Sequence, residues 1–109
     1  MIKKIEHIGI AIDNVDSSVA LFDKLLNKSS YKSELVVSEG VKTHFYQVGD
    51  TKIELLEAIS KNSPISTFLS QKGQGMHHLA FHVDDIHQEL NRLTALGFEA
   101  IGEIGRAHV

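Results

Sequence analysis

The feature of this sequence that most constrains its fold is an internal repeat. When His7 is aligned with His78, the residues that follow match over an apolar strand, a pair of Asp or Asn residues and a stripe of apolar residues at helical spacing. Chance agreement of a few apolar positions is common, but agreement of three successive features in one register is not. The chain is therefore expected to contain two copies of a strand–helix unit.

Each copy has the local features of a strand followed by a helix. Residues 5–12 and 77–83 are apolar and partly β-branched, as in buried strands. The Asp or Asn pair that follows can supply the oxygen that caps the first free amides of a helix, and apolar residues then recur at helical spacing. Between the copies, three further strands and then a helical turn with a glycine-containing loop are expected, at residues 31–39, 41–48, 51–59 and 62–75.

The composition excludes several classes of function. The 109 residues suffice for one domain with a modest core. A formal net charge of −3 and the lack of a Lys/Arg-rich run argue against a nucleic-acid partner. There is no cysteine, so disulfides, thiolate metal sites and cysteine nucleophiles are excluded. Neither a signal peptide nor a membrane span is recognisable, so no membrane partner is expected and a cytoplasmic location is the default.

Strand alternation places the two repeated histidines beside small residues. His7 shares its face with Gly9, and His78 shares its face with Ala80. A small neighbour beside a polar side chain leaves room for a pocket lined by the sheet. If a pseudo-twofold axis relates the two copies, the two histidines face each other across one cleft. His77 is expected to point the opposite way and to be structural.

Glu54 can add a carboxylate to this cleft. It lies in the middle of an apolar strand, where an unpaired charge is costly, so it should meet solvent, a cation or a metal. Two histidines and a carboxylate in one cleft form a site for a first-row divalent metal with open positions for water or substrate. Each residue also has a structural explanation, because a lone histidine in a strand is commonly a hydrogen-bonded structural residue and a lone glutamate commonly faces solvent. Recurrence at equivalent positions favours His7 and His78 as ligands.

Four segments of the chain carry a family resemblance: EHIGIAI, GDTKIELLE, SPISTFL and GMHHLAFHVDDI. Together they resemble the methylmalonyl-CoA epimerases of the vicinal oxygen chelate (glyoxalase/bleomycin-resistance) superfamily, and the similarity extends to about Gly102. The first segment is typical of the whole superfamily, whereas the succession of the other three is specific to the epimerase branch. The resemblance implies an α+β fold of paired βαβββ modules, each of which curls into half of an open barrel around a divalent metal.

The resemblance also implies a set of metal ligands. In that family the histidine of the first strand and the second histidine of the HH pair bind the metal, and these are His7 and His78 here. Glu54 occupies the third ligand position, which epimerases can fill with glutamine and glyoxalases with glutamate. The fourth ligand is a glutamate on a final strand that has no counterpart in this sequence. Cobalt or manganese is the expected metal, with zinc or nickel as alternatives.

Two further residues are expected to line the substrate pocket. One bacterial epimerase places a carboxylate base at the position of Thr43, and a threonine cannot act as that base. Thr43 and Gln47 share one face of their strand and are therefore expected to contact substrate. No residue of this sequence is assigned as the catalytic group that removes or returns a proton.

The activity implied by the resemblance is inversion at C2 of methylmalonyl-CoA, a carbon between a thioester and a carboxylate. A metal that chelates both oxygens stabilises the enolate formed when the C2 proton leaves, and a proton is then returned from the other side. The implied partners are an acyl-CoA substrate and a second copy of the chain in a homodimer. Two alternatives remain, a glyoxalase I-type lactoylglutathione lyase and a metal-free, ligand-sequestering module of the bleomycin-resistance type.

The expected organisation is one domain whose second module is incomplete. The first βαβββ module covers residues 1–58, a linker covers 59–75, and a partial second module with a strand in the segment GFEAIGE covers 76–102. Residues 103–109, EIGRAHV, resemble a translated sequencing adaptor and are expected to be a non-native tail. The second module would then lack two strands and the fourth ligand, so this form of the protein can be inactive.

Overall fold

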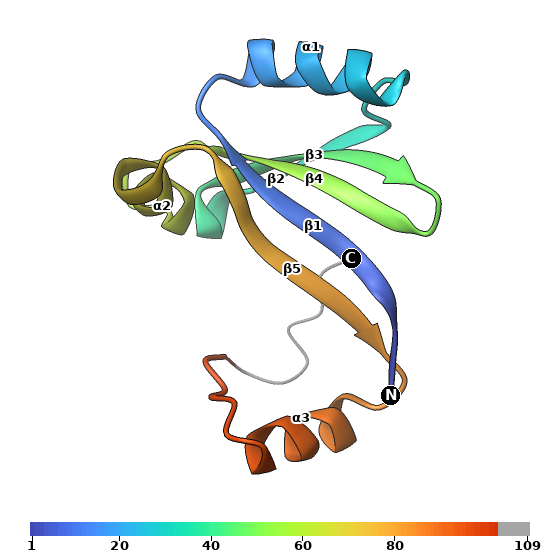
Figure 1. The fold of residues 1–109 in the computed structure, drawn as a ribbon. Helices are drawn as coiled ribbons and strands as arrows, with labels where there is room; N and C mark the ends of the chain where they lie inside the picture. The colour runs from blue at the N-terminus through green and yellow to red at the C-terminus, as the bar shows by residue number, and fades with distance from the viewer. Residues whose placement is uncertain (103–109) are drawn as a thin grey trace. The chain divides into compact units, whose positions relative to one another are not determined.

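The computed structural model describes residues 1–102 of the chain. Its helices and strands follow the predicted order as far as α3 (Figure 1). A short 3-10 helix follows the second strand. The elements are β1 (Ile2–Ile12), α1 (Val15–Leu26), β2 (Lys32–Val36), η1 (Val37–Glu39), β3 (Val41–Val48), β4 (Thr51–Ala58), α2 (Pro64–Lys72), β5 (Gly75–Val83) and α3 (Ile86–Ala95). The predicted α+β fold, one βαβββ module followed by part of a second, is confirmed.

The strands form a five-stranded mixed sheet in the order β2-β3-β4-β1-β5. β3 pairs antiparallel with both β2 and β4, whereas β1 pairs parallel to β4. A parallel pair needs a long crossover between its two strands, and the segment containing α1, β2 and β3 supplies it here. The sequence-distant strands β1 and β4 therefore lie side by side, and the residues of the candidate site lie on these two strands and on β5.

The chain divides into two compact units, Ile5–Ala80 and a second unit that joins Met1–Lys4 to the segment from Phe81 onward. Within the first unit, the two faces of the sheet pack against different helices. One face packs against the apolar stripe of α1 through the buried side chains Ile12, Tyr46 and Leu55. The other face packs against α2 through the buried side chains Ala11, Val41, Leu56 and Ile65. The face of β1 that carries Ile10 and Ile12, opposite His7, is thus the face covered by α1.

Side-chain caps start both helices of the repeat where the sequence predicts them. The Oδ1 atom of Asn14 accepts a hydrogen bond from the backbone N–H of Ser17 at 2.9 Å. In the second copy, the Oδ1 atom of Asp85 accepts one from the N–H of Gln88 at 3.0 Å. Each cap satisfies an amide that has no partner within its own helix. The repeat therefore extends from the sequence pattern to the hydrogen bonds of the two helix starts.

Two strands predicted from the sequence differ in the structure. The strand expected at residues 31–39 covers only Lys32–Val36, because the chain then turns through η1 to Gly40, which has a φ of 64°. The strand expected in GFEAIGE is not formed over residues 98–102. A strand needs a neighbour that pairs with its backbone N–H and C=O groups, which an apolar sequence does not by itself provide. The tail predicted at residues 103–109 lies outside the described residues.

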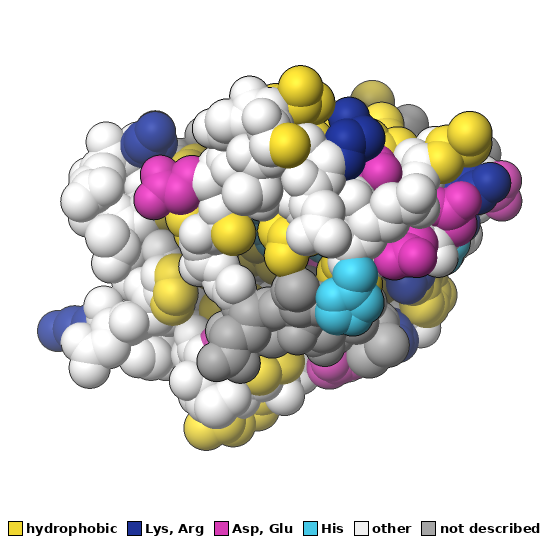
Figure 2. All heavy atoms as spheres, turned by 90° about the horizontal axis from the view of Figure 1, so that it is seen from below, with side chains coloured by type: hydrophobic (Ala, Val, Ile, Leu, Met, Phe, Trp, Pro, Cys, Tyr) yellow, Lys and Arg dark blue, Asp and Glu magenta, His cyan; other side chains and the backbone are white. Residues whose placement is uncertain are grey.

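The surface of the described chain exposes many apolar side chains, and Figure 2 shows several of them in yellow on one face. On β5, Met76, Leu79 and Phe81 are 63%, 43% and 50% exposed. None of the helices within residues 1–102 has the length and apolar character that crossing a lipid bilayer requires.

Candidate metal centre

The register of the sheet puts the predicted site residues on one face. His7 of β1 pairs with Lys52 of β4, and Gly9 pairs with Glu54. Glu54 pairs in turn with Phe45 of β3. Residues that are directly opposite each other on paired strands point to the same side of a sheet. His7, Gly9 and Glu54 therefore share the face on which α2 packs, away from α1.

The His7 side chain is the centre of this cluster, and it is only 2% exposed. Its Nε2 lies 3.0 Å from Nε2 of His78, with the two rings edge to face. Its Nδ1 lies 2.5 Å from Oε1 of Glu6 and 3.5 Å from Oε2 of Glu54. All three predicted ligands therefore meet around one imidazole, although Glu54 and His78 approach different nitrogens of it.

The His78 ring lies directly over Gly9. A Cβ atom added to Gly9 would be only 2.7 Å from both ring nitrogens of His78, closer than side chains tolerate. The space predicted beside His7 is thus filled by the ring of His78. Because Gly9 pairs with Glu54 in the sheet, the backbone of Glu54 is also next to this ring.

Two charged side chains, Glu6 and Lys52, form an ion pair beside His7. The Glu6 carboxylate accepts from Nδ1 of His7 through Oε1, and its Oε2 is 3.2 Å from the ammonium of Lys52. Burial alone would raise the pKa of Glu6, but the hydrogen bonds from His7 and Lys52 outweigh burial and lower this pKa below its ordinary value. The same hydrogen bond raises the pKa of Lys52. Glu6 is therefore a carboxylate and Lys52 an ammonium at neutral pH.

His77 also takes part in the cluster, contrary to the orientation predicted from alternation. Its Nδ1 lies 2.9 Å from Nδ1 of His78, and its ring meets Phe68 of α2 edge to face, with centroids 5.0 Å apart. Strand alternation assigns Glu6 and His77 to the far side, so sequence reasoning missed both. One signal could have identified them, because each repeated histidine is preceded by a polar side chain in an otherwise apolar strand.

The donor atoms of this cluster fit a divalent metal. Two nitrogens bound to one ion at about 2.1 Å are about 3.0 Å apart when they meet at a right angle, which is the separation of the Nε2 atoms of His7 and His78. The ligand atoms of Glu6, His7 and Glu54 also lie within 4.8 Å of one another. The Glu54 side chain is only 10% exposed, and a buried carboxylate is stabilised by a cation. To join both histidines on one ion, the Glu54 carboxylate must turn toward the Nε2 side of His7.

The two residues expected to contact substrate occupy different environments. Thr43 is 8% exposed and pairs with Leu56, whose side chain belongs to the core against α2. Gln47 is exposed near the end of β3, where its amide donates to the backbone carbonyl of Gly49 at 2.8 Å. Thr43 therefore borders the buried face, while Gln47 binds the hairpin turn.

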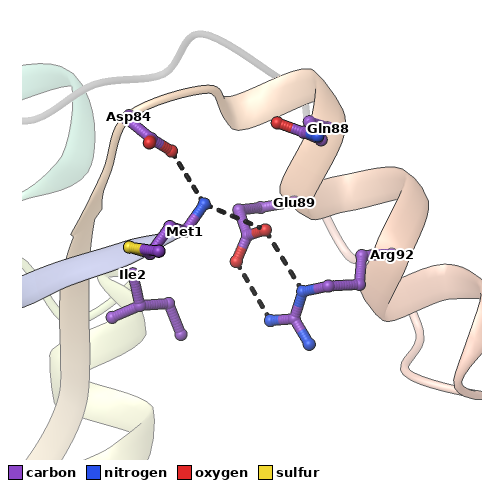
Figure 3. A pocket seen from close by; sticks show the side chains of 6 residues that line it. All are labelled: Met1, Ile2, Asp84, Gln88, Glu89 and Arg92. Carbon is purple, nitrogen blue, oxygen red and sulfur yellow. Dashed lines mark hydrogen bonds and ion pairs between the residues drawn. The ribbon is translucent and has the colours of Figure 1, made fainter.

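A separate hollow of about 590 Å³ belongs to the unit that contains α3. Figure 3 shows the side chains that line it, Met1, Ile2, Asp84, Gln88, Glu89 and Arg92. The N-terminal ammonium lies 2.7 Å from Asp84 and 3.3 Å from Glu89, and Glu89 also accepts two hydrogen bonds from Arg92. Charges within the lining thus neutralise one another, and no histidine among residues 1–102 lines this hollow.

Curated relatives of the chain include both uncharacterized proteins and epimerases. The uncharacterized protein YqjC of Bacillus subtilis is 33% identical over 91 residues, which are 84% of this chain and 65% of YqjC. The mitochondrial methylmalonyl-CoA epimerase of Dictyostelium discoideum is 36% identical over 95 residues, 86% of this chain and 57% of the epimerase. The chain thus spans less than two thirds of the length of either relative.

Solved structures share the fold. A hypothetical protein of Bacillus halodurans, BH1468, superposes with a TM-score of 0.80 at 35% identity and covers 86% of this chain and 68% of its own. A variant of Streptomyces coelicolor methylmalonyl-CoA epimerase in complex with 2-nitronate-propionyl-CoA superposes with a TM-score of 0.76 at 24% identity, covering 91% of this chain and 73% of the epimerase. At that identity, the second likeness concerns the fold alone.

The family comparison covers nearly the whole chain. Residues 6–108 match the family described as the Glyoxalase/Bleomycin resistance protein/Dioxygenase superfamily. The match includes the two repeated strands, the hairpins between them and the histidine cluster. The chain therefore belongs to the glyoxalase/bleomycin resistance protein/dioxygenase superfamily, in which it is related to methylmalonyl-CoA epimerases.

Proposed function

We propose that this chain acts in the epimerisation of methylmalonyl-CoA, at a divalent metal centre formed by His7, Glu54 and His78. One observation carries the proposal: the Nε2 atoms of His7 and His78 lie 3.0 Å apart, and the buried carboxylate of Glu54 lies 3.5 Å from the other ring nitrogen of His7. The relationship to methylmalonyl-CoA epimerases supports the choice of substrate. Cobalt or manganese is proposed as the metal, because imidazole and carboxylate donors suit both.

In this proposal the residues of the chain bind and orient. His7 and His78 hold the metal through their Nε2 atoms, and Glu54 holds it through its carboxylate. When bound, the metal supplies a Lewis acid that stabilises negative charge on the oxygens of a bound thioester and carboxylate. Thr43 contributes a buried hydroxyl to the sheet face that carries the site. The apolar core between that face and α2 excludes water next to Thr43. The proton-transferring base is not assigned to any residue.

Hydrogen exchange at C2 of methylmalonyl-CoA tests the proposal. The 109-residue chain loaded with Co²⁺ is incubated with this thioester in D₂O, and deuterium at C2 is measured by mass spectrometry. We expect incorporation above the protein-free rate, and a return to that rate in His7→Ala and His78→Ala. His44→Ala is the control, because His44 pairs with Glu57 at 3.2 Å and has no contact with His7 or His78 among the described hydrogen bonds.

Two results would count against the proposal. Absence of exchange in the Co²⁺-loaded chain would remove the epimerase activity, and unchanged exchange in both alanine variants would remove the metal centre from the reaction. Turnover of the glutathione hemithioacetal of methylglyoxal in place of exchange would indicate the lyase alternative.

We further propose that the chain works as a homodimer.

A further inference from the structure

Each predicted histidine ligand is preceded in the chain by a side chain that contacts its Nδ1 atom. Glu6 contacts Nδ1 of His7 at 2.5 Å, and His77 contacts Nδ1 of His78 at 2.9 Å. Glu6 and His77 occupy equivalent positions in the two copies of the repeat. The same arrangement is therefore built twice, on two strands far apart in the sequence.

On the first strand, Glu6 determines which nitrogen of His7 carries the ring hydrogen. A carboxylate only accepts hydrogen bonds, so Nδ1 of His7 must carry the hydrogen in this contact. In the neutral ring Nε2 then has a lone pair, which is directed at His78. Lys52 binds the other oxygen of Glu6 at 3.2 Å, so the carboxylate is held from two sides.

On the second strand, His77 and Gly9 together restrict the His78 ring. Nδ1 of His77 holds Nδ1 of His78, and the His77 ring is itself held edge to face by Phe68 of α2. The face of His78 rests on Gly9, where no side chain is tolerated. The ring is therefore restricted at its Nδ1 edge and on one face, which leaves Nε2 directed at His7.

We propose that Glu6 and His77 are positioning residues that hold the rings of His7 and His78 by Nδ1, so that both Nε2 atoms are directed at one point. The role of that point as a metal site rests on the proposed function. Hydrogen bonds of this kind orient metal-ligating histidines and set their tautomer. Glu6 could instead be a ligand, since it clusters with His7 and Glu54. At 2.5 Å, however, its oxygen and Nδ1 of His7 are too close to be two ligands of one ion, which are about 3.0 Å apart at bond lengths near 2.1 Å.

Metal affinity in paired variants tests both positioning residues. Co²⁺ is titrated into the full chain and followed by its visible absorption, with thermal unfolding measured on every variant. Glu6→Leu and His77→Phe remove the polar partner, and the second keeps a ring against Phe68. Glu6→Gln and His77→Asn keep an acceptor in the same place. His44→Asn is the matched control on β3.

We expect Glu6→Leu and His77→Phe to weaken Co²⁺ binding about 10- to 100-fold, as loss of such hydrogen bonds does at other metal sites. Glu6→Gln, His77→Asn and the control should remain within about threefold of the unsubstituted chain. Equal, large losses in Glu6→Leu and Glu6→Gln would make Glu6 a ligand and overturn its positioning role. Unchanged affinity in His77→Phe would overturn the role of His77.

Ring ¹⁵N spectra of the metal-free chain separate this inference from the proposed function. We expect the His7 ring to carry its hydrogen on Nδ1 in the unsubstituted chain and in Glu6→Gln, and to lose this preference in Glu6→Leu. A hydrogen on Nε2 of His7 in the unsubstituted chain would overturn the inference for Glu6. If the chain binds no Co²⁺, the proposed function fails, while these spectra still decide whether Glu6 orients His7.

Discussion

The smallest side chain of the candidate site decides how the two histidines approach. Gly9 lies beneath the His78 ring, and it has no special backbone conformation that would demand glycine. Glycine matters here because it has no side chain: a Cβ atom at this position would lie 2.7 Å from two ring nitrogens of His78. The close contact between His7 and His78 therefore depends on the lack of a side chain at Gly9.

Gly9→Ala is predicted to destabilise the protein by about 1–3 kcal/mol, the usual cost of overpacking a filled site. It should also weaken Co²⁺ binding, because the His78 ring must move away from His7. Urea unfolding and Co²⁺ titration measure the two effects. Gly102→Ala is the control, since a Cβ atom there meets nothing within 4 Å. Equal stability of the two variants would show that the ring can move at no cost.

At this scale the sequence predicted part of the site. Alternation and the repeat identified His7, His78 and the small neighbour Gly9, because the direction of successive side chains in a strand is a local property. The same rule assigned Glu6 and His77 to the opposite face. Each of them nevertheless contacts the Nδ1 atom of the histidine that follows it in the chain, a contact between neighbours that alternation does not describe.

Among the elements, β3 and α1 are joined by one buried hydroxyl. Tyr46 of β3 is completely buried, and its hydroxyl donates to Asp23 at 2.7 Å and to the carbonyl of Val19 at 3.3 Å. Burial raises the pKa of Tyr46, and the hydrogen bond to Asp23 raises this pKa further, so the phenol remains a donor at every physiological pH. A polar contact thus locks a helix that otherwise packs through apolar side chains.

Tyr46→Phe is predicted to lower the free energy of unfolding by about 1.5 kcal/mol, the lower end for a hydrogen bond to a charged group, because Asp23 keeps some access to water. Urea unfolding followed by circular dichroism measures the change. Tyr31→Phe, at a side chain that is 51% exposed, should change stability by far less. A similar loss in both variants would contradict the role of the buried hydroxyl.

In the second unit, Asp84, which directly follows β5, and Glu89 of α3 form ion pairs with the N-terminal ammonium of Met1 (Figure 3). The hydrogen bond with Asp84 raises the pKa of the Met1 ammonium above its ordinary value of 8.0. The same hydrogen bond lowers the pKa of Asp84 below 3.8. The contact therefore stabilises this unit only while both groups are charged.

The pH dependence of unfolding follows from these two directions. The raised pKa of Met1 adds stability that is present below pH 8.0 and lost as the pH rises through the folded pKa. The lowered pKa of Asp84 adds stability that is present above pH 3.8 and lost as the pH falls through the folded pKa. When melting temperatures are measured from pH 3 to 10, Asp84→Asn should reduce both the loss of stability at acid pH and the loss at alkaline pH. Asp13→Asn, the equivalent change in the first copy of the repeat, should leave the alkaline loss intact.

For the whole molecule, the exposed apolar side chains of β5 bear on the proposed homodimer. β5 ends the strand order among the described residues, and Phe81 and Leu79 are about half exposed on it. Apolar side chains on a strand at the edge of a sheet favour pairing with another chain. A second copy of this chain is the partner that the proposal names.

Sedimentation at about 5–50 μM, the range over which a weak dimer with a micromolar Kd populates both states, tests this association. For the unsubstituted chain we expect an average mass between monomer and dimer that rises with concentration, and in Phe81→Lys, which puts a charge on β5, a shift toward the monomer. Lys61→Glu, a charge change in the turn before α2, should leave the dimer unchanged. A monomer at all concentrations would remove the homodimer from the proposal.

Taken by itself, the sequence determined the order of the elements from β1 to α3, the repeat, the helix caps and the face on which His7 and His78 lie. These features follow from local rules, because the periods of strands and helices and the chemistry of caps depend on neighbouring residues. Tertiary structure decided which side chains meet. The contacts of Glu6 with Lys52, His77 with Phe68 and His7 with His78 join residues from different elements. They depend on strand register and side-chain rotamers, and no local pattern specifies either.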